Sequence, residues 1–429
     1  MNAFWRETLH YSAARLFSAA ASVVVLFATA RALGPDGRGV LVTAVTWVTA
    51  FATLAALSLG QVCHHQIQER RSSNWLPGLL GTMVTVGGIA CVLAYSGLLW
   101  LVARWGLGGI SLPIVATAGL MIPLLVFDEY ARNLLAATDS LKAYSRAQFI
   151  GNTLRLLFVW LAIGPLGWGV FGVLVSLIAS QLVIAVLEGG KLLHQAGGKV
   201  SFDVQHARPL LASALRLHPN TVASFVLIYA NILLLAELVS SAAVAWYQFA
   251  LQLLTALLLV PQGAATVMLA EIARNGPDAA WPRHRNVVGK ALLVVALLGI
   301  ALGLCAAPMI ELLAGSDFVP AANLLRWLLP AVLGMALAEL LAPQWYSRGL
   351  FLTATALTCA SALAHVALNW CLIQRHGIFG AVIGTSISYV AIVAAAQIAF
   401  ALWCESRHRK FSRSPASAML RSSSGSRTA

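Results

Sequence analysis

Long unbroken apolar stretches are the feature that most constrains how this sequence can fold. A helix needs about 20 mostly apolar residues to cross about 30 Å of hydrocarbon, and stretches of this length follow one another along the 429-residue chain. Hydrophobic residues make up 59% of the sequence and charged residues only 10%, whereas an ordinary soluble domain has about 25% charged residues. The excess apolar surface has to face lipid, so we expect about twelve membrane-spanning segments. They are expected near 11–33, 39–60, 76–103, 109–127, 147–164, 168–188, 218–237, 242–270, 289–314, 322–343, 351–373 and 378–403.

The same stretches exclude several other classes of protein. Strands of a membrane β-barrel alternate in polarity over about 10 residues, and these solid runs do not, so the spans are expected to be α-helices. The first run leads into Arg31-Ala32-Leu33-Gly34-Pro35 rather than a small-residue cleavage site, which argues against a removable signal peptide. Six scattered cysteines without a CxxC pair indicate neither a disulfide framework nor a metal site. No cofactor is indicated.

The basic residues are distributed unevenly between the two sides of the predicted membrane. If the N-terminus is cytoplasmic, 21 of the 28 Lys and Arg residues fall in inner segments and 5 in outer segments. This bias follows the positive-inside rule, and it accounts for the net charge of +13 without nucleic acid as a partner. An even number of spans then places the C-terminus in the cytoplasm as well.

One sequence pattern occurs twice, about 200 residues apart. Ile163-Gly164-Pro165-Leu166-Gly167-Trp168-Gly169-Val170-Phe171-Gly172 and Arg375-His376-Gly377-Ile378-Phe379-Gly380 each lead into an apolar span. Six spans return the chain to its starting side, so the two halves form parallel repeats, as in transporters whose bundles rock about a central site. We expect an N-terminal six-helix bundle at 1–188, a cytoplasmic linker at 189–217, a C-terminal six-helix bundle at 218–403 and a disordered basic cytoplasmic tail at 404–429.

Five segments carry a resemblance to a known family. The first is the turn Ala30-Arg31-Ala32-Leu33-Gly34-Pro35-Asp36-Gly37-Arg38-Gly39. The others are Leu238-Val239-Ser240-Ser241 with Trp246-Tyr247-Gln248-Phe249-Ala250, Ile310-Glu311-Leu312-Leu313-Ala314-Gly315-Ser316-Asp317-Phe318, Leu368-Asn369-Trp370-Cys371-Leu372-Ile373 and Gly377-Ile378-Phe379-Gly380-Ala381. In order and spacing they resemble the polysaccharide flippases, the Wzx-like branch of the multidrug/oligosaccharidyl-lipid/polysaccharide exporter superfamily. The sequence departs from the family at Val239–Ala245, which lacks the glycine commonly found before the aromatic residue.

The resemblance, which covers nearly the whole chain, implies both a fold and a function. The fold would be an all-α polytopic membrane protein with about twelve transmembrane helices, in two six-helix bundles around a central cavity. The function would be translocation of a polyprenyl-diphosphate-linked oligosaccharide from the inner to the outer leaflet of the bacterial inner membrane, for exopolysaccharide or O-antigen biosynthesis. Its partners would be the lipid-linked oligosaccharide, membrane lipids and polysaccharide polymerase or ligase machinery. No enzyme activity is expected.

Two arginines lie within predicted spans, where a charged side chain costs about 2.5–3.5 kcal/mol and usually faces a cavity or a partner. Arg15 lies in the first span and Arg155 in the fifth. A guanidinium group pairs two phosphate oxygens at once, so both arginines are candidates for binding the diphosphate, and related flippases place an arginine in the inner half of helix 1. Two alternatives stay open. Arg15 can extend to the membrane interface, and Arg155 can pair with a carboxylate.

Other polar side chains inside the spans are candidates for a sugar path or for ion coupling. Glu339 lies near the centre of the tenth span, either as a protonatable coupling group or as the partner of an arginine. Hydrogen-bonding groups in the seventh and eighth spans can line a path for sugars, but such groups also join membrane helices to one another. These residues are His218, Asn220, Asn231 and Gln248.

Two rival functions remain open from the sequence. A multidrug or small-cation antiporter could use the same scaffold, although acidic rather than basic residues would then be expected in its cavity. A membrane-embedded polysaccharide polymerase or ligase would need a large outer loop with catalytic Arg or His residues. The outer loops here are short, and only Arg375 and His376 lie together in one of them.

Overall fold

The computed structural model describes residues 3–62, 75–202 and 204–412, with side chains from Leu16 onward except at 205–206. All regular secondary structure in these ranges is helical. Nine helical stretches are long and apolar enough to cross a membrane, and two of them, Leu16–Ala56 and Phe351–Ser412, have 41 and 62 residues, enough for two spans each. The shorter helix α6 (Leu141–Ile163) adds a further span. The expected set of twelve spans is therefore confirmed.

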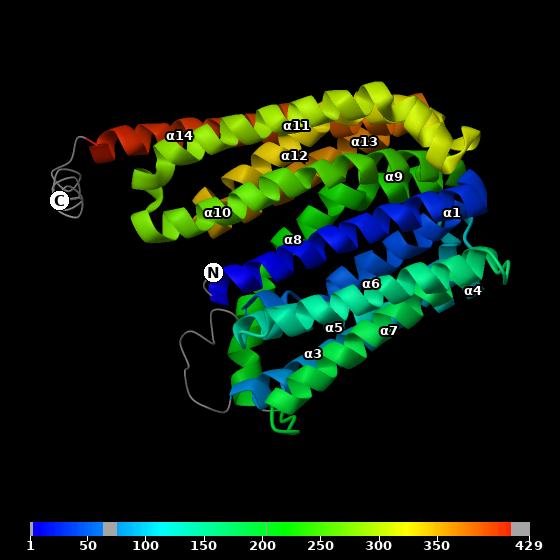
Figure 1. The fold of residues 1–429 in the computed structure, drawn as a ribbon, viewed down its shortest axis with the longest axis horizontal. Coiled ribbons are helices and arrows are strands. Elements are labelled where there is room, and N and C mark those ends of the chain that lie inside the picture. The colour runs from blue at the N-terminus through cyan, green and yellow to red at the C-terminus, as the bar shows by residue number, and fades with distance from the viewer. Residues whose placement is uncertain (1–2, 63–74, 203, 413–429) are drawn as a thin grey trace. The chain divides into compact units, whose positions relative to one another are not determined.

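The chain forms two compact units, of which the first comprises Met1–Phe249 and Ile310–Val319. Figure 1 shows the helices of this unit. They are α1 (Ala3–Ala56), α3 (Trp75–Trp105), η1 (Leu107–Gly109), α4 (Leu112–Gly119), α5 (Met121–Ala137), α6, α7 (Gly169–Gln195), α8 (Val204–Leu238), the start of α9 (Ser241–Thr255) and η3 (Ser316–Phe318).

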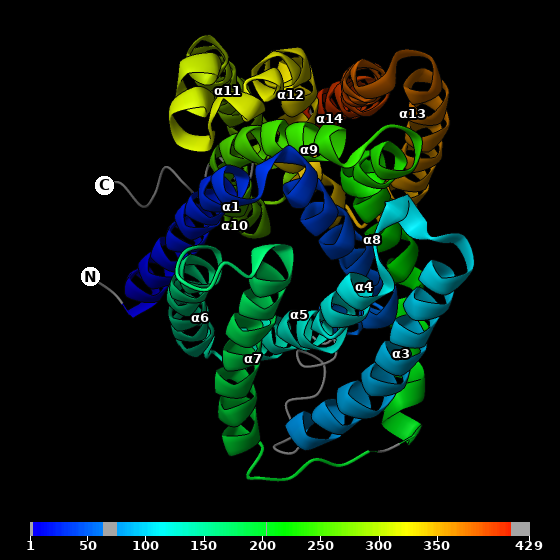
Figure 2. The same cartoon turned by 90° about the vertical axis from the view of Figure 1, so that its right-hand side faces the viewer.

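Helix α1 combines the first two predicted spans in 54 residues. Gly34 is its one non-helical residue, with φ 65° and ψ −179°, and Pro35 follows directly. A positive φ is a conformation that glycine adopts without steric cost, and proline disfavours helical geometry in the residue before it. The sequence Gly-Pro therefore breaks the helix between the two spans. Figure 2 shows the two limbs of α1 meeting at an apex.

The second compact unit comprises Ala250–Met309 and Pro320–Ala429. The pattern that occurs twice in the sequence marks equivalent turns. Gly164–Trp168 lies between α6 and α7, and the non-helical Gly377 divides the last two spans. The elements of this unit are the rest of α9, η2 (Ala256–Leu258), α10 (Leu259–Asn275), most of α11 (Pro277–Ala314), α12 (Pro320–Ser347), α13 (Phe351–Ile387), the π-helical segment η4 (Ser388–Ala394) and α14 (Ala395–Ser412).

Large apolar side chains cover the outside of both units. Val92 and Leu93 on α3, and Leu304 on α11, are each more than 60% exposed in the isolated chain. Exposed apolar surface of this extent is rare on soluble monomers. It is the surface that a span presents to lipid.

Several helix ends differ from the predictions. The interval 189–217, predicted as a linker, is largely helical, because α7 continues to Gln195 and α8 begins at Val204. The tail predicted as disordered from residue 404 is helical to Ser412, and residues 413–429 lie outside the described residues. Helix α11 begins at Pro277, twelve residues before the predicted start of its span. These helices continue past the apolar runs into polar segments, and a prediction based on apolar length does not detect that continuation.

Candidate functional site

A row of polar contacts joins α1 and α6 inside the first unit. Helix α6 carries Gln148, Asn152 and Arg155 at a spacing of four and three residues, which places them on one face. Helix α1 carries Ser18 and Ser22. Asn152 Nδ2 donates to Ser18 Oγ at 2.8 Å, and Arg155 Nη2 donates to Ser22 Oγ at 3.1 Å. These five residues form what we call the polar seam.

Arg155 is the charged member of the polar seam. Its side chain is half-buried, and its Nε has no hydrogen-bond partner among the described residues. Each ion pair found within the described residues involves another arginine, and no carboxylate oxygen there lies within 4.0 Å of the Arg155 guanidinium. A guanidinium carries five N–H donors, and the serine accepts one of them. Arg155 therefore has N–H groups left that can donate hydrogen bonds to an anion.

A pair of carboxylates lies at one end of the polar seam. Gln148 Nε2 donates to Asp128 Oδ1 at 2.7 Å and to Glu188 Oε1 at 3.3 Å. Glu188 is only 1% exposed, and its Oε2 has no hydrogen-bond partner in the part of the chain that the structure describes. Two carboxyl groups therefore lie at the Gln148 end of the seam and a guanidinium group at the Arg155 end.

Arg15 belongs to α1 in the structure, but its side chain lies outside the described residues. It precedes Ser18 by three residues and Ser22 by seven, a spacing that places all three on one face of a helix.

The predicted candidates in the seventh and eighth spans lie in the first unit but away from the polar seam. His218 Nδ1 lies 3.2 Å from Ser58 Oγ. Asn231 is buried and donates from Nδ2 to the hydroxyl of Tyr247 at 3.2 Å. Asn220 is half-buried on α8. These contacts join α8 to the turn that follows α1 and to α9.

Gln248 accepts a hydrogen bond from Arg38, a residue that the sequence placed in an outer segment. Arg38 is only 5% exposed and donates from Nη2 to Gln248 Oε1 at 2.9 Å and from Nη1 to Thr29 Oγ1. No ion pair of Arg38 is found among the described residues. The burial of this arginine was not predicted. The sequence feature that could have indicated its burial is the Gly-Arg-Gly run at 37–39, because glycine neighbours allow another helix to pack closely against Arg38.

Glu339, in the second unit, lies on an exposed face of α12. The sequence placed it near the centre of a span, and the structure shows that it does not point into the core of its own unit.

An apolar cavity of about 170 Å³ lies between α3 and α5. It contains no charged side chain and does not reach the polar seam. Its lining residues are Leu80, Met83, Val84, Gly87, Gly88, Cys91, Pro123, Val126, Phe127, Tyr130 and Leu134. Within the described chain, no group of three or more His, Cys, Asp and Glu side chains is arranged to hold a metal ion.

Comparison with known proteins adds a family and a fold. The family model described as polysaccharide biosynthesis protein matches residues 4–270, which is more than half of the chain. No curated protein matches the sequence. An inward-facing multidrug resistance MATE family transporter of the MOP superfamily aligns with a TM-score of 0.74 at 15% identity, covering 92% of this chain and 96% of that one.

Two further solved structures agree with this fold. The lipid II flippase MurJ, in an inward closed conformation, aligns with a TM-score of 0.69 at 12% identity over 91% of this chain and 87% of that one. An outward-facing MATE family transporter aligns with a TM-score of 0.64 at 15% identity over 95% and 96%. At these identities the likeness shows the fold alone. The expected arrangement of about twelve helices in two bundles is confirmed as that fold.

Proposed function

This chain belongs to the polysaccharide biosynthesis protein family, and from that premise we propose that it flips a polyprenyl-diphosphate-linked oligosaccharide across the bacterial inner membrane. The chain is a multi-pass membrane protein whose fold is that of known transporters and flippases. Transfer would run from the inner to the outer leaflet and supply surface polysaccharide biosynthesis. The observation that carries the proposal is the family match, combined with a half-buried arginine among the spans that has no carboxylate partner.

The cargo explains why such an arginine is useful. A diphosphate and several sugars cannot cross hydrocarbon unaided, because buried charges and unpaired hydroxyl groups cost too much free energy. A guanidinium pairs phosphate oxygens in a planar fork. In the proposal Arg155 and Arg15 bind the diphosphate, while the polyprenyl tail stays in lipid.

The remaining polar residues have a secondary place in the proposal. His218, Asn220, Asn231 and Gln248 would hydrogen-bond sugars along the path, and Glu339 would serve in ion coupling. Alternating access through a cationic central cavity would move the cargo. A membrane potential of 100 mV, negative inside, contributes about 2.3 kcal/mol per charge moved, which favours the outward movement of an anionic headgroup.

The test is complementation of a deletion strain. Loss of the gene should abolish surface polysaccharide and leave lipid-linked oligosaccharide on the cytoplasmic side, and the wild-type gene should restore transport. Arg155→Ala and Arg15→Ala should fail to restore it at normal membrane levels. Arg155→Lys should restore it only in part, because an ammonium group lacks the planar fork.

A matched control lies on the same helix as Arg155. Thr153 is exposed, and its hydroxyl bonds only to the carbonyl of Phe149 in its own helix, at 2.8 Å. Thr153→Ala should therefore complement fully. Full complementation by Arg155→Ala would refute the assigned diphosphate site.

A multidrug or small-cation antiporter is the second candidate, since the MATE transporter shares the fold. The same strain separates the two functions. Intact surface polysaccharide in the deletion strain, together with altered drug sensitivity, would replace the flippase proposal with the antiporter.

A further inference from the structure

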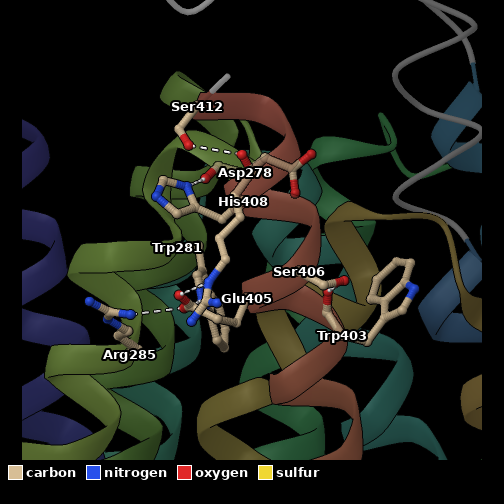
Figure 3. A network of polar contacts seen from close by, with 9 residues as sticks. Asp278, Trp281, Arg285, Trp403, Glu405, Ser406, His408 and Ser412 are labelled. Carbon is tan, nitrogen blue, oxygen red and sulfur yellow. Dashed lines mark hydrogen bonds and ion pairs between the residues drawn. The ribbon is translucent and has the colours of Figure 1, made fainter. Parts of the chain in front are cut away.

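Two carboxylates in the second unit each hold more than one arginine. Glu405 on α14 receives Arg285 Nη1 at 2.9 Å, Arg409 Nε at 3.2 Å and the indole Nε1 of Trp281 at 2.8 Å. Figure 3 shows Arg285 and Trp281 reaching from α11 to Glu405. The carboxylate thus joins the start of α11 to the end of α14.

The second carboxylate is Glu271, near the end of α10. Arg283 Nη1 lies 3.1 Å from its Oε2, and Arg274 Nη2 lies 4.0 Å from the same atom. Asn275 Nδ2 donates to Oε1 at 2.9 Å. We call Arg274, Arg283, Arg285 and Arg409 the arginine cluster.

The arginine cluster has more positive charge than its carboxylates neutralise. Its four side chains are 53–73% exposed, whereas those of Glu271 and Glu405 are 15% and 22% exposed. Each guanidinium has five N–H donors, and only some of them bond to a carboxylate or a backbone carbonyl. The carboxylates hold the forks in place, and the exposure of the arginine side chains leaves the remaining donors accessible to an anion.

A nearby arginine shows the contrasting, structural case. Arg348 is 6% exposed, its Nη2 lies 2.8 Å from Asp278 Oδ1, and its guanidinium lies over the ring of Trp403 at 5.1 Å. Its charge is paired and covered by protein. The arginine cluster is exposed and only partly neutralised.

Apolar surface adjoins the arginine cluster along the same helices. On α14, Leu402 and Trp403 are exposed one to two turns before Arg409. On α11, Leu293 is exposed two turns after Arg285. An anion bound by the cluster is therefore flanked by side chains that face acyl chains, and an exposed tryptophan at the end of a span is typical of the headgroup level.

We propose that the arginine cluster binds the phosphate of an anionic phospholipid such as phosphatidylglycerol. The planar forks supply paired donors for the phosphate oxygens, and the adjoining apolar faces of α11 and α14 contact the acyl chains. A lipid fits this surface better than a soluble anion, which would gain nothing from the apolar flank. The assignment does not depend on the cargo proposed above.

The experiment is native mass spectrometry of the full-length chain in detergent, titrated with phosphatidylglycerol or phosphatidylcholine. The wild type should retain phosphatidylglycerol preferentially. The triple variant R283Q/R285Q/R409Q should have an affinity for phosphatidylglycerol that is lower by at least about tenfold, since each basic residue near an anionic surface contributes to binding. The control R104Q/R326Q/R375Q, which removes three exposed arginines elsewhere, should bind as the wild type does.

A second variant separates lipid binding from a purely structural role. Glu405→Gln breaks the ion pairs of Arg285 and Arg409 but keeps every arginine, so it should bind phosphatidylglycerol at least as well as the wild type. Equal loss in Glu405→Gln and in the triple variant would overturn the proposal. So would equal retention of phosphatidylcholine, or displacement of the lipid by inorganic phosphate at the same concentration.

Discussion

At the scale of single residues, Arg38 shows how a charge is accommodated inside a membrane protein without an ion pair. Its guanidinium is held by two neutral oxygens, on Thr29 and Gln248. Hydrogen bonds to a charged group contribute about 1.5–3 kcal/mol each. Because Gln248 lies 210 residues away in sequence, its bond to Arg38 joins distant parts of the first unit.

Replacement of Gln248 by Leu should therefore destabilise the protein. The change leaves a buried donor of Arg38 without its acceptor, which costs about 1–3 kcal/mol. We expect a lower apparent midpoint of thermal unfolding in detergent. Gln61→Leu, at an exposed position in the helical segment after the end of α1, is the control and should leave the midpoint nearly unchanged. An equal midpoint in Gln248→Leu and wild type would mean that Arg38 finds another acceptor.

At the scale of helices, α1 and α9 approach so closely that no side chain fits between them. A β-carbon at Gly39 would overlap the backbone carbonyl of Ser241, the first residue of α9. Backbone atoms cannot rotate away as the end of a flexible side chain can. The absence of a side chain at Gly39 therefore fixes the distance between the two helices.

Gly39→Ala should separate α1 from α9 and lower the yield of folded protein. Overpacking of a tight contact typically costs about 1–3 kcal/mol. The matched control is Gly88→Ala on α3, where an added β-carbon meets no atom within 4 Å. The measurement is the fraction of monodisperse protein recovered after extraction. Equal recovery of the two variants would contradict the close approach.

At the scale of the whole molecule, the predicted topology places both termini in the cytoplasm. Within the second unit, three segments predicted to be cytoplasmic do meet at one end. Asp278 at the start of α11 pairs with Arg348 after α12, and its carbonyl lies 2.7 Å from His408 Nδ1 on α14. Which side of the membrane this end faces stays a prediction of the positive-inside rule.

Cysteine labelling tests the orientation. In a cysteine-free background, Arg104→Cys should react with a membrane-impermeant maleimide in intact cells, because the segment between the third and fourth predicted spans is predicted to be outside. Lys199→Cys, between α7 and α8, should react only after permeabilisation. Both positions are exposed, so access to reagent is the variable that differs. The reverse labelling pattern would invert the topology.

The sequence was sufficient for the spans and the equivalent turns, because apolar length and Gly-Pro or Gly-aromatic runs determine them locally. Helix ends such as Pro277 of α11 were missed, since helices continue past the hydrocarbon into polar segments. Arg155 was a candidate from its charge alone, and its role stays a prediction. Its contact with Ser22 could not be predicted, because one sequence does not say which helices pack together. Glu188 was missed for the same reason, although Gln148, Asn152 and Arg155 already lay on one helical face.

The long sequence separation between Arg38 and Gln248 has a consequence for biogenesis. The ribosome delivers the second span to the insertion machinery long before it has made the helix that carries Gln248. Until then the arginine has only Thr29, so the nascent hairpin of the first two spans should rest shallow, with Arg38 near the headgroups. Arrested chains that end before residue 248 should leave residue 38 open to aqueous reagents, and longer chains should protect it. The final depth of the second span is thus set late in translation, by a residue 210 positions further along the chain.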